Sequence, residues 1–220
     1  MTPLPPWLYQ LVGHVVAPGA KHQLRAVLAQ WRKSHPAPGP SLDVGCGTRS
    51  WLHTIGLQPL GVDVDARRVA VFARRHGQAV QASATALPFA DGGFDSVWCF
   101  GLLHHLSHDD ARRAVREMRR VTRCGGYTIV FDGVWPRASW QRPVATWLRR
   151  LDHGGWMRSQ DELERLLAPF GNWERNRLTY SLTGLEGVLF TQRIGLPDLK
   201  QEDGLGPQVL CPTLRTVRPS

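Results

Sequence analysis

The chain has 220 residues, of which 42% are hydrophobic and 20% are charged. These proportions are typical of one globular domain with a sizeable core, and they exclude collagen-like, coiled-coil and wholly disordered chains. Lys and Arg number 27 against 18 Asp and Glu, which gives a net charge of +9. Almost all of the cations are arginines, and they are spread along the chain without a groove-reading motif. We therefore expect local structural or small-molecule roles for this charge and predict no nucleic-acid partner.

The four cysteines, Cys46, Cys99, Cys124 and Cys211, are too far apart in the sequence for a C-x-x-C pair. Four cysteines in a chain of this length do not make a disulfide scaffold either, so we predict no metal site and a cytoplasmic location. The apolar residues near the N-terminus are interrupted by a glutamine, a glycine and a histidine within 10–14. This pattern predicts neither a signal peptide nor a membrane span.

Residues 7–33 have helical spacing of apolar positions, interrupted at Pro18-Gly19, which predicts two short helices. The proline-rich stretch 35–40 predicts a linker. We therefore expect residues 1–40 to form an N-terminal helical cap and linker before the main domain at 41–194.

Strand-like and helix-like segments alternate through the next part of the chain. Strands are predicted at 42–44, 60–63, 79–82, 94–100 and 127–131, and helices at 66–76 and 107–123. A strand followed by a glycine turn, a helix and another strand is the pattern of a parallel βαβ unit. The sequence thus predicts an α/β fold, a Rossmann-like doubly wound sheet of five or more parallel strands with helices on both faces.

The regular alternation breaks at 134–158, a segment rich in Trp and Arg. A capped helix is predicted from Ser159 to about Pro169, and two strands at 173–180 and 186–193 with a short turn between them. These two strands predict a terminal antiparallel addition to the sheet. The tail at 195–220 contains four prolines, and we expect it to be extended or disordered.

The first predicted strand ends in a glycine turn that is suited to a nucleotide-type ligand. Gly45 and Gly47 allow the backbone to approach a ligand closely, and the following helical turn offers free N–H groups. Asp63 ends the second strand, where a carboxylate can accept hydrogen bonds from both hydroxyls of a ribose. A helix-capping role fits Asp65 better than Asp63.

Five motifs, in order and spacing, resemble the class I S-adenosylmethionine-dependent methyltransferases, in particular the small-molecule group that includes the ubiquinone and menaquinone C-methyltransferases. The resemblance covers residues 41–194. The motifs are Leu42-Asp43-Val44-Gly45-Cys46-Gly47-Thr48, Gly61-Val62-Asp63, Ala86-Leu87-Pro88-Phe89-Ala90-Asp91-Gly92-Gly93-Phe94-Asp95, Leu102-Leu103-His104-His105-Leu106 and Arg123-Cys124-Gly125-Gly126-Tyr127.

The resemblance implies S-adenosyl-L-methionine as cofactor, held at the ends of the first four strands. The residues that it implies for cofactor binding are Asp43, Gly45, Cys46, Gly47, Asp63, Val64, Ser83, Ala84, Thr85, Cys99 and Phe100. Two positions depart from the family pattern. Arg49 replaces a usual glycine and puts a cation near the cofactor cleft, and Ser83 replaces an acidic residue that often binds the adenine amino group.

Methyl transfer from a sulfonium needs alignment and exclusion of water more than a covalent residue. Where the acceptor must lose a proton, His104 or His105 is the candidate base, with Asp132 as a further candidate. The alternative is that both histidines are structural, one in the core and one capping the next helix. Residues 134–158 are predicted to be a lid over an apolar small-molecule acceptor with an acidic group, or else an ordinary amphipathic helix on the sheet.

Two other functions share part of this pattern. A nicotinamide-dependent dehydrogenase normally has a third glycine at the position of Ser50, which makes that activity a weak alternative. A non-catalytic S-adenosylmethionine-binding or interaction module remains open because of the departures at Arg49 and Ser83.

Overall fold

The computed structural model describes residues 20–35, 39–137, 140, 142–151, 155–180 and 184–195. The first helix expected near the N-terminus and nearly all of the expected tail at 195–220 lie outside these residues. Within them, the second N-terminal helix is present as α2, Ala20–Ser34.

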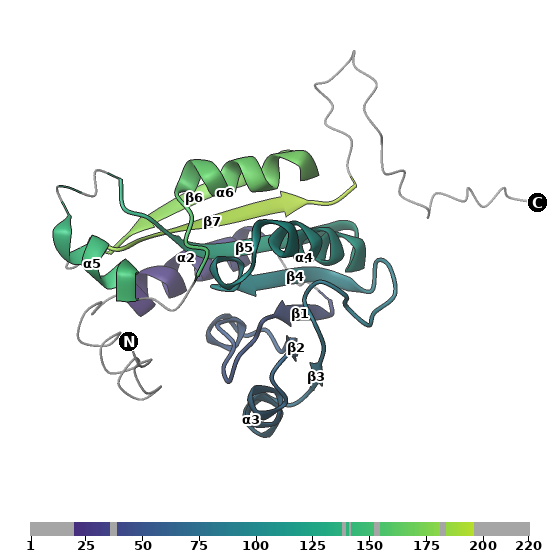
Figure 1. Ribbon diagram of the computed structural model, residues 1–220. Coiled ribbons are helices and arrows are strands. Elements are labelled where there is room, and N and C mark those ends of the chain that lie inside the picture. The colour runs from purple at the N-terminus through teal and green to yellow at the C-terminus, as the bar shows by residue number, and fades with distance from the viewer. Residues whose placement is uncertain are drawn as a thin grey trace, which may run out of the picture.

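Seven strands form one sheet in the order β3-β2-β1-β4-β5-β7-β6 (Figure 1). They are β1 Ser41–Val44, β2 Leu60–Asp63, β3 Ala79–Gln81, β4 Phe94–Phe100, β5 Thr122–Val134, β6 Glu174–Thr179 and β7 Glu186–Arg193. The first five pair in parallel, and β7 runs antiparallel between β5 and β6. The predicted doubly wound sheet with an antiparallel terminal addition is confirmed.

Helices pack on both faces of this sheet (Figure 1). After α2 they are α3 Ala66–His76, α4 His108–Val121, α5 Pro143–Leu151 and α6 Gln160–Leu167, with short 3-10 turns η1 Leu52–Ile55, η2 Leu103–His105 and η4 Ala168–Phe170. Local capping explains several of the starts. The Ser107 hydroxyl accepts a hydrogen bond from the Asp110 N–H at 3.1 Å, and Ser159 and Glu162 form a complete capping box.

The alternation of side chains along β4 creates two hydrophobic layers. Val97 and Cys99 face the layer that includes residues of α4 and α6, whereas Trp98 faces the layer of α2 and η1. The Trp31 ring of α2 meets the Trp98 ring edge-on, with the ring centroids 4.5 Å apart. Helix α2 therefore belongs to the packed core of the sheet.

One strand starts earlier than the sequence predicts. Strand β5 begins at Thr122 rather than at 127, because the chain runs directly from α4 into the sheet.

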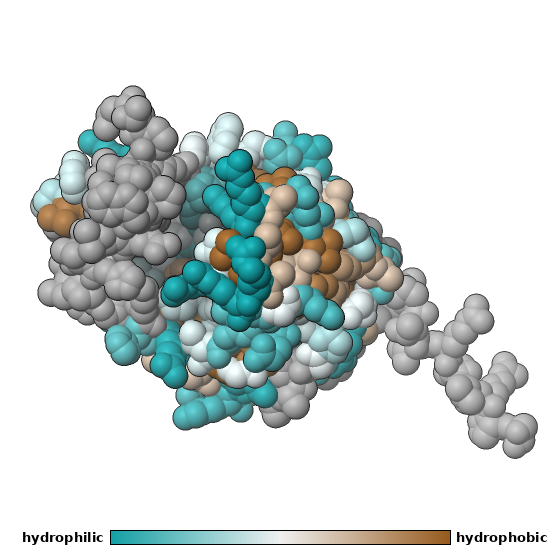
Figure 2. Space-filling view, turned by 90° about the horizontal axis from the view of Figure 1, so that it is seen from below, coloured by the Kyte–Doolittle hydropathy of each residue, from teal (hydrophilic) through white to brown (hydrophobic). Residues whose placement is uncertain are grey.

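On the α3 side, Figure 2 shows hydrophobic residues interrupted by hydrophilic ones, as expected for an outer helix that faces solvent. No helix among the described residues is long and apolar enough to cross a membrane.

Candidate active site at the carboxyl edge of the sheet

The turn after β1 is shaped by two glycines with positive φ. Gly45 has φ +73°, and a Cβ there would lie only 3.0 Å from the Leu102 side chain. Gly47 has φ +58°, and a Cβ there would meet nothing within 4 Å. The first glycine thus permits close packing of the β4–η2 connection, and the second borders open space beside the loop. Arg49, in the same loop, is exposed.

Asp63 ties this loop to the end of β2. Its Oδ2 accepts a hydrogen bond from the Gly47 N–H at 3.0 Å, and its Oδ1 accepts one from the Asp65 N–H at 2.9 Å. The side chain is 5% exposed. Val64 follows directly and is 70% exposed. Asp65, as predicted, caps α3 by accepting from the Arg67 N–H.

Asp43 is a buried carboxyl group beneath the loop. Burial is the main cause that raises its pKa to about 7, a hydrogen bond with Ser50 opposes the rise, and the nearby negative charge of Asp63 adds to it. Its Oδ1 has no hydrogen-bond partner. A buried oxygen without a partner is costly, so Asp43 fits a site where a cationic ligand supplies the missing interaction.

The remaining predicted cofactor residues lie at the ends of β3 and β4. The Ser83 hydroxyl is 2.8 Å from the Thr85 hydroxyl and accepts a hydrogen bond from the Thr85 N–H, so Ser83 stabilises the turn around Ala84. Cys99 is buried, which is the main reason that its pKa is raised well above the usual value. Phe100 is half-buried and stacks on Trp98. All of the predicted residues thus reach the same edge, because β3, β2, β1 and β4 are consecutive in the sheet.

His104 and Asp132 form a buried pair at the ends of neighbouring strands. The His104 Nδ1 is 2.5 Å from the Asp132 Oδ1, and the His104 backbone N–H donates to Asp132 Oδ2 at 3.0 Å. Gly133 N–H donates to the same carboxylate at 2.8 Å. A carboxylate only accepts hydrogen bonds, so Nδ1 carries the proton and Nε2 becomes the basic nitrogen. Leu102, which packs on Gly45, brings this pair next to the glycine loop.

The other predicted histidine has a different environment. His105 is exposed, and its ring centroid lies 4.1 Å from that of His104. The structure pairs Asp132 with the His104 ring. Among the two candidates, His104 has the arrangement expected of an oriented base.

Arg158 is a site residue that the sequence analysis missed. It is 8% exposed, and its guanidinium donates to the carbonyls of Leu103 at 2.6 Å and Leu106 at 2.9 Å. The Trp156 N–H donates to the His104 carbonyl at 3.0 Å. These contacts hold the η2 turn from outside. An arginine in an arginine-rich segment gave no signal of this role in the sequence.

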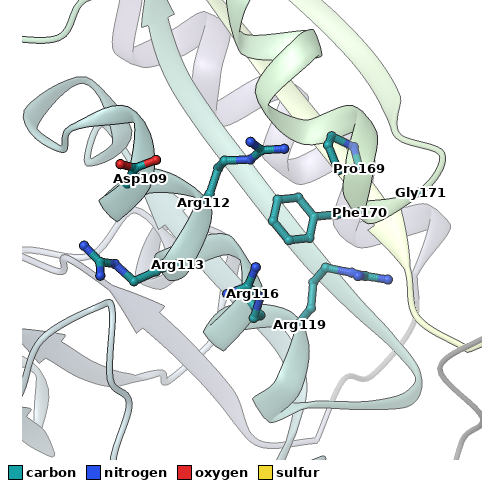
Figure 3. Close-up of a pocket in the computed structure, with 8 residues that line it drawn as sticks. All are labelled: Asp109, Arg112, Arg113, Arg116, Arg119, Pro169, Phe170 and Gly171. Atoms are coloured by element: carbon teal, nitrogen blue, oxygen red, sulfur yellow. The ribbon is translucent and has the colours of Figure 1, made fainter. Parts of the chain in front are cut away.

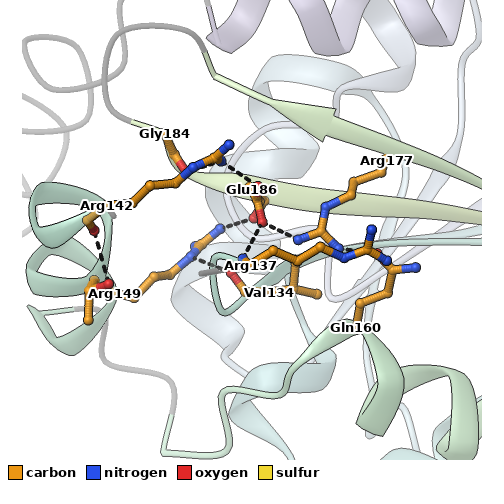
Figure 4. A network of polar contacts seen from close by, with 9 residues as sticks. Val134, Arg137, Arg142, Arg149, Gln160, Arg177, Gly184 and Glu186 are labelled. Carbon is orange, nitrogen blue, oxygen red and sulfur yellow. Dashed lines mark hydrogen bonds and ion pairs between the residues drawn. The ribbon is translucent and has the colours of Figure 1, made fainter. Parts of the chain in front are cut away.

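Residues 134–158 are anchored to the sheet through Glu186 at the start of β7 (Figure 4). The Glu186 carboxylate is 2% exposed and accepts hydrogen bonds from Arg142, Arg177 and the Arg137 N–H. Arg149 donates to the Glu186 carbonyl and to the Val134 carbonyl. The Arg149 guanidinium thus ties α5 to the backbone of β5 and β7. Arg150 is exposed.

A comparison with known protein families gives a match that includes the glycine loop after β1. Residues 42–130 match the family model "Methyltransferase domain". Over this part, which is less than half of the chain, the protein is similar to methyltransferases. The match covers the glycine loop, Asp63 and the η2 turn, and it ends two residues before Asp132. The class I methyltransferase fold that the resemblance implied is confirmed.

Curated relatives each match less than half of this chain. "Probable tRNA methyltransferase 9B" of Homo sapiens is 36% identical over 100 residues, covering 42% of this chain and 20% of that protein. An O-methyltransferase of Aspergillus sclerotiorum is 34% identical over 113 residues, covering 46% of this chain and 42% of that protein. The chain thus spans less than half the length of either relative.

Among solved structures, an S-adenosylmethionine-dependent methyltransferase of Thermotoga maritima, described as a possible histamine N-methyltransferase, has a TM-score of 0.62. It is 18% identical, and the alignment covers 85% of this chain and 96% of that chain. At this identity the likeness shows the fold, including the strand order that brings the predicted site residues to one edge.

Proposed function

We propose that this protein transfers the methyl group of S-adenosyl-L-methionine to a small-molecule acceptor and that His104 is the general base. One observation carries the proposal: the His104–Asp132 pair lies at the carboxyl edge of the sheet and packs, through Leu102, on the Gly45 loop. Base and cofactor loop thus share one site.

The cofactor would be held by groups that already fit it. Asp63 has a buried carboxylate at the end of β2 in a position to accept hydrogen bonds from the ribose hydroxyls, and the exposed Val64 offers an apolar surface beside it. The loop at Gly47 borders space for the methionine part. Asp43, with its unpartnered Oδ1, is the carboxyl group suited to the positive charge of the ligand.

The reaction is an in-line displacement at the methyl carbon. When bound, the cofactor supplies an activated methyl group on a sulfonium. His104 Nε2 accepts the proton of an acceptor O–H or acidic C–H. The freed electron pair of the acceptor would form the new bond to the methyl carbon, and the C–S electron pair would return to the sulfur of the departing cofactor product. Asp132 stabilises the imidazolium that forms, because it holds Nδ1–H in a charge-assisted hydrogen bond.

The acceptor would be selected by residues 134–158, the predicted lid. Trp140, Trp147 and Trp156 are 80%, 60% and 52% exposed, which is a large apolar area for one segment. The exposed Arg150 is the cation of α5 that remains suited to an acidic group. An apolar acceptor with a carboxylate or phenolate fits this chemistry.

The test measures methyl transfer and cofactor binding separately. Release of S-adenosylhomocysteine is followed over quinone precursors, phenols and fatty acids, with and without His104→Gln. General bases contribute about 10²–10⁴-fold to rates, so we expect turnover to fall by that range. Cofactor affinity by titration calorimetry should stay within about twofold of wild type. His108→Gln, an exposed histidine at the start of α4, is the matched control.

Equal loss of cofactor binding and turnover in His104→Gln would show that the residue only supports the fold. Titration also tests the non-catalytic alternative, which predicts cofactor binding without turnover on any acceptor. A tRNA arm belongs in the same screen, because relatives of this chain carry tRNA methyltransferase names. Turnover on tRNA alone would replace the small-molecule acceptor by a nucleic acid.

A further inference from the structure

The arginines of α4 divide into paired and unpaired sets. Arg113 pairs with Asp110 at 2.8 Å, and Arg120 pairs with Glu117 at 2.8 Å. Arg120 also binds Asp91 and two backbone carbonyls of the preceding loop. The carboxylates of Asp110 and Glu117 are thus already paired.

Three other arginines of α4 make no ion pair with any residue that the structure describes: Arg112, Arg116 and Arg119. Their spacing of four and three residues places them on one stripe of the helix, about 6 Å and 4.5 Å apart along its axis. This stripe begins just after the η2 turn and leads away from the candidate active site. It concentrates positive charge that the fold itself does not neutralise.

The stripe forms one wall of a groove of about 920 Å³. Figure 3 shows Arg112 and Arg119 reaching toward the η4 turn, on either side of the Phe170 ring. Pro169 and Gly171 complete the opposite wall, and Asp109 is the single acidic residue among the lining residues. The groove is within the volume range of small-molecule sites, about 300–1,000 Å³.

Arg119 has no carboxylate partner among the residues that the structure describes. Its Nε is buried without a hydrogen-bond partner, and burial lowers the pKa of this guanidinium. Its guanidinium carbon lies 5.8 Å from the centre of the Phe170 ring, which is a weak cation–π contact. A half-buried cation with an unpartnered buried N–H gains most from an anion that brings several acceptor oxygens.

We propose that the groove between α4 and η4 binds a polyphosphate group of a small molecule, at a site separate from the methyl-transfer site. Guanidinium groups bind phosphate oxygens bidentately, and linked phosphates present the closely spaced anions that a stripe of three arginines can contact together. Phe170 is 8% exposed, so it offers no free ring face on which a base could stack. The groove therefore recognises the phosphates themselves.

The experiment titrates the full chain with inorganic tripolyphosphate in low salt. Wild type should bind it. Arg116→Gln should weaken binding by about tenfold, because the charge-assisted hydrogen bonds of one guanidinium to the phosphates are lost. The Arg112→Gln and Arg116→Gln double variant should weaken it further. Arg74→Gln, which changes an exposed arginine on α3 that does not line the groove, should bind like wild type. Unchanged S-adenosylmethionine affinity in each variant verifies the fold.

Three outcomes overturn the proposal. If the wild-type protein does not bind tripolyphosphate at millimolar concentration, the groove is not a polyphosphate site. An equal loss in Arg74→Gln and Arg116→Gln shows that only net charge matters. A hairpin RNA that binds more tightly than tripolyphosphate, and loses affinity with the same arginines, makes the groove a nucleic-acid surface. Because cofactor binding and methyl transfer are measured apart from this titration, failure here leaves the proposed function unaffected.

Discussion

The Asp63 carboxylate accepts hydrogen bonds from two backbone N–H groups and lies where the ribose is expected. Asp63→Ala should lower cofactor affinity at least tenfold, because hydrogen bonds to charged groups contribute about 1.5–3 kcal/mol each. Titration calorimetry measures this, and thermal unfolding checks the fold. Asp63→Asn is the matched variant and should lose less, because its amide keeps one acceptor oxygen. Unchanged affinity in Asp63→Ala would refute the ribose assignment.

Asp43 makes cofactor binding sensitive to pH. Its pKa of about 7 in the free protein means that the carboxyl group is largely protonated below pH 7. A sulfonium nearby favours the ionised form, so binding at pH 6 must release a proton. We expect affinity to weaken by up to about tenfold per pH unit below 7.

Calorimetry at pH 6 and pH 8, in buffers of different ionisation enthalpy, counts the released proton. Asp43→Asn should abolish both the proton release and the pH dependence. The same pKa has an opposite effect on folding: the folded value lies above the unfolded 3.8, so the stability from this group is present at low pH and is lost as pH rises toward 7. Affinity that does not change between the two pH values would mean that Asp43 does not face the cationic group.

The η2 turn depends on contacts from a segment that is fifty residues away in sequence. Arg158→Lys keeps the charge but loses the planar pair of donors that reach Leu103 and Leu106. We expect kcat to fall by as much as about 10²-fold through misplacement of His104, while the KM for the cofactor changes by less than twofold. Arg165→Lys on the outer face of α6 is the control. A matching rise in KM would assign Arg158 to general support of the fold.

Local signals predicted most of the elements. The bounds of α3 and the starts of α4 and α6 follow from apolar spacing and from Asp65, Ser107 and Ser159 as caps. The carboxyl-edge location of Asp63 and His104 follows from strand order in a parallel sheet. These features need only short-range information.

The features that the sequence did not predict depend on tertiary contacts. On α4, each acidic residue has several arginines at helical spacing. Arg120 pairs with Glu117 and also with Asp91 of the preceding loop, a contact that helical spacing does not predict. Which of His104 and His105 meets Asp132 depends on the direction of one short turn. The backbone partners of Arg149, the carbonyls of Val134 and Glu186, depend on how the segment folds onto the sheet.

Two histidines link the stability of the molecule to pH. His53 and His76 stack with their ring centres 4.1 Å apart, and both have a buried Nε2 without a hydrogen-bond partner. Burial is the main cause that lowers each pKa, and for His76 the charges of His53, Arg75 and Arg49 add to it. A histidine with a lowered folded pKa is protonated preferentially in the unfolded chain. Stability from this pair is therefore present above pH 6.5 and is lost as pH falls below it.

The pair is tested by thermal unfolding of wild type and His53→Gln at pH 7.5 and pH 5.5. Removing one titrating ring should reduce the drop in Tm that wild type shows between these values. Measuring the difference between the two proteins cancels the opposite contribution of Asp43. An identical drop in both proteins would show that the stacked pair does not govern acid sensitivity.

The segment between β5 and α6 starts and ends at the same place. The Trp135 N–H donates to the Arg158 carbonyl at 3.0 Å, and Val134 bridges to Arg158. Because the two ends of the segment already meet, an insertion of different length can replace it at these points without moving the sheet. Glu186 limits the exchange. It is buried and pairs both with Arg142 from within the segment and with Arg177 of β6, so a transplanted segment without a cation at this point leaves Arg177 as its ion-pair partner.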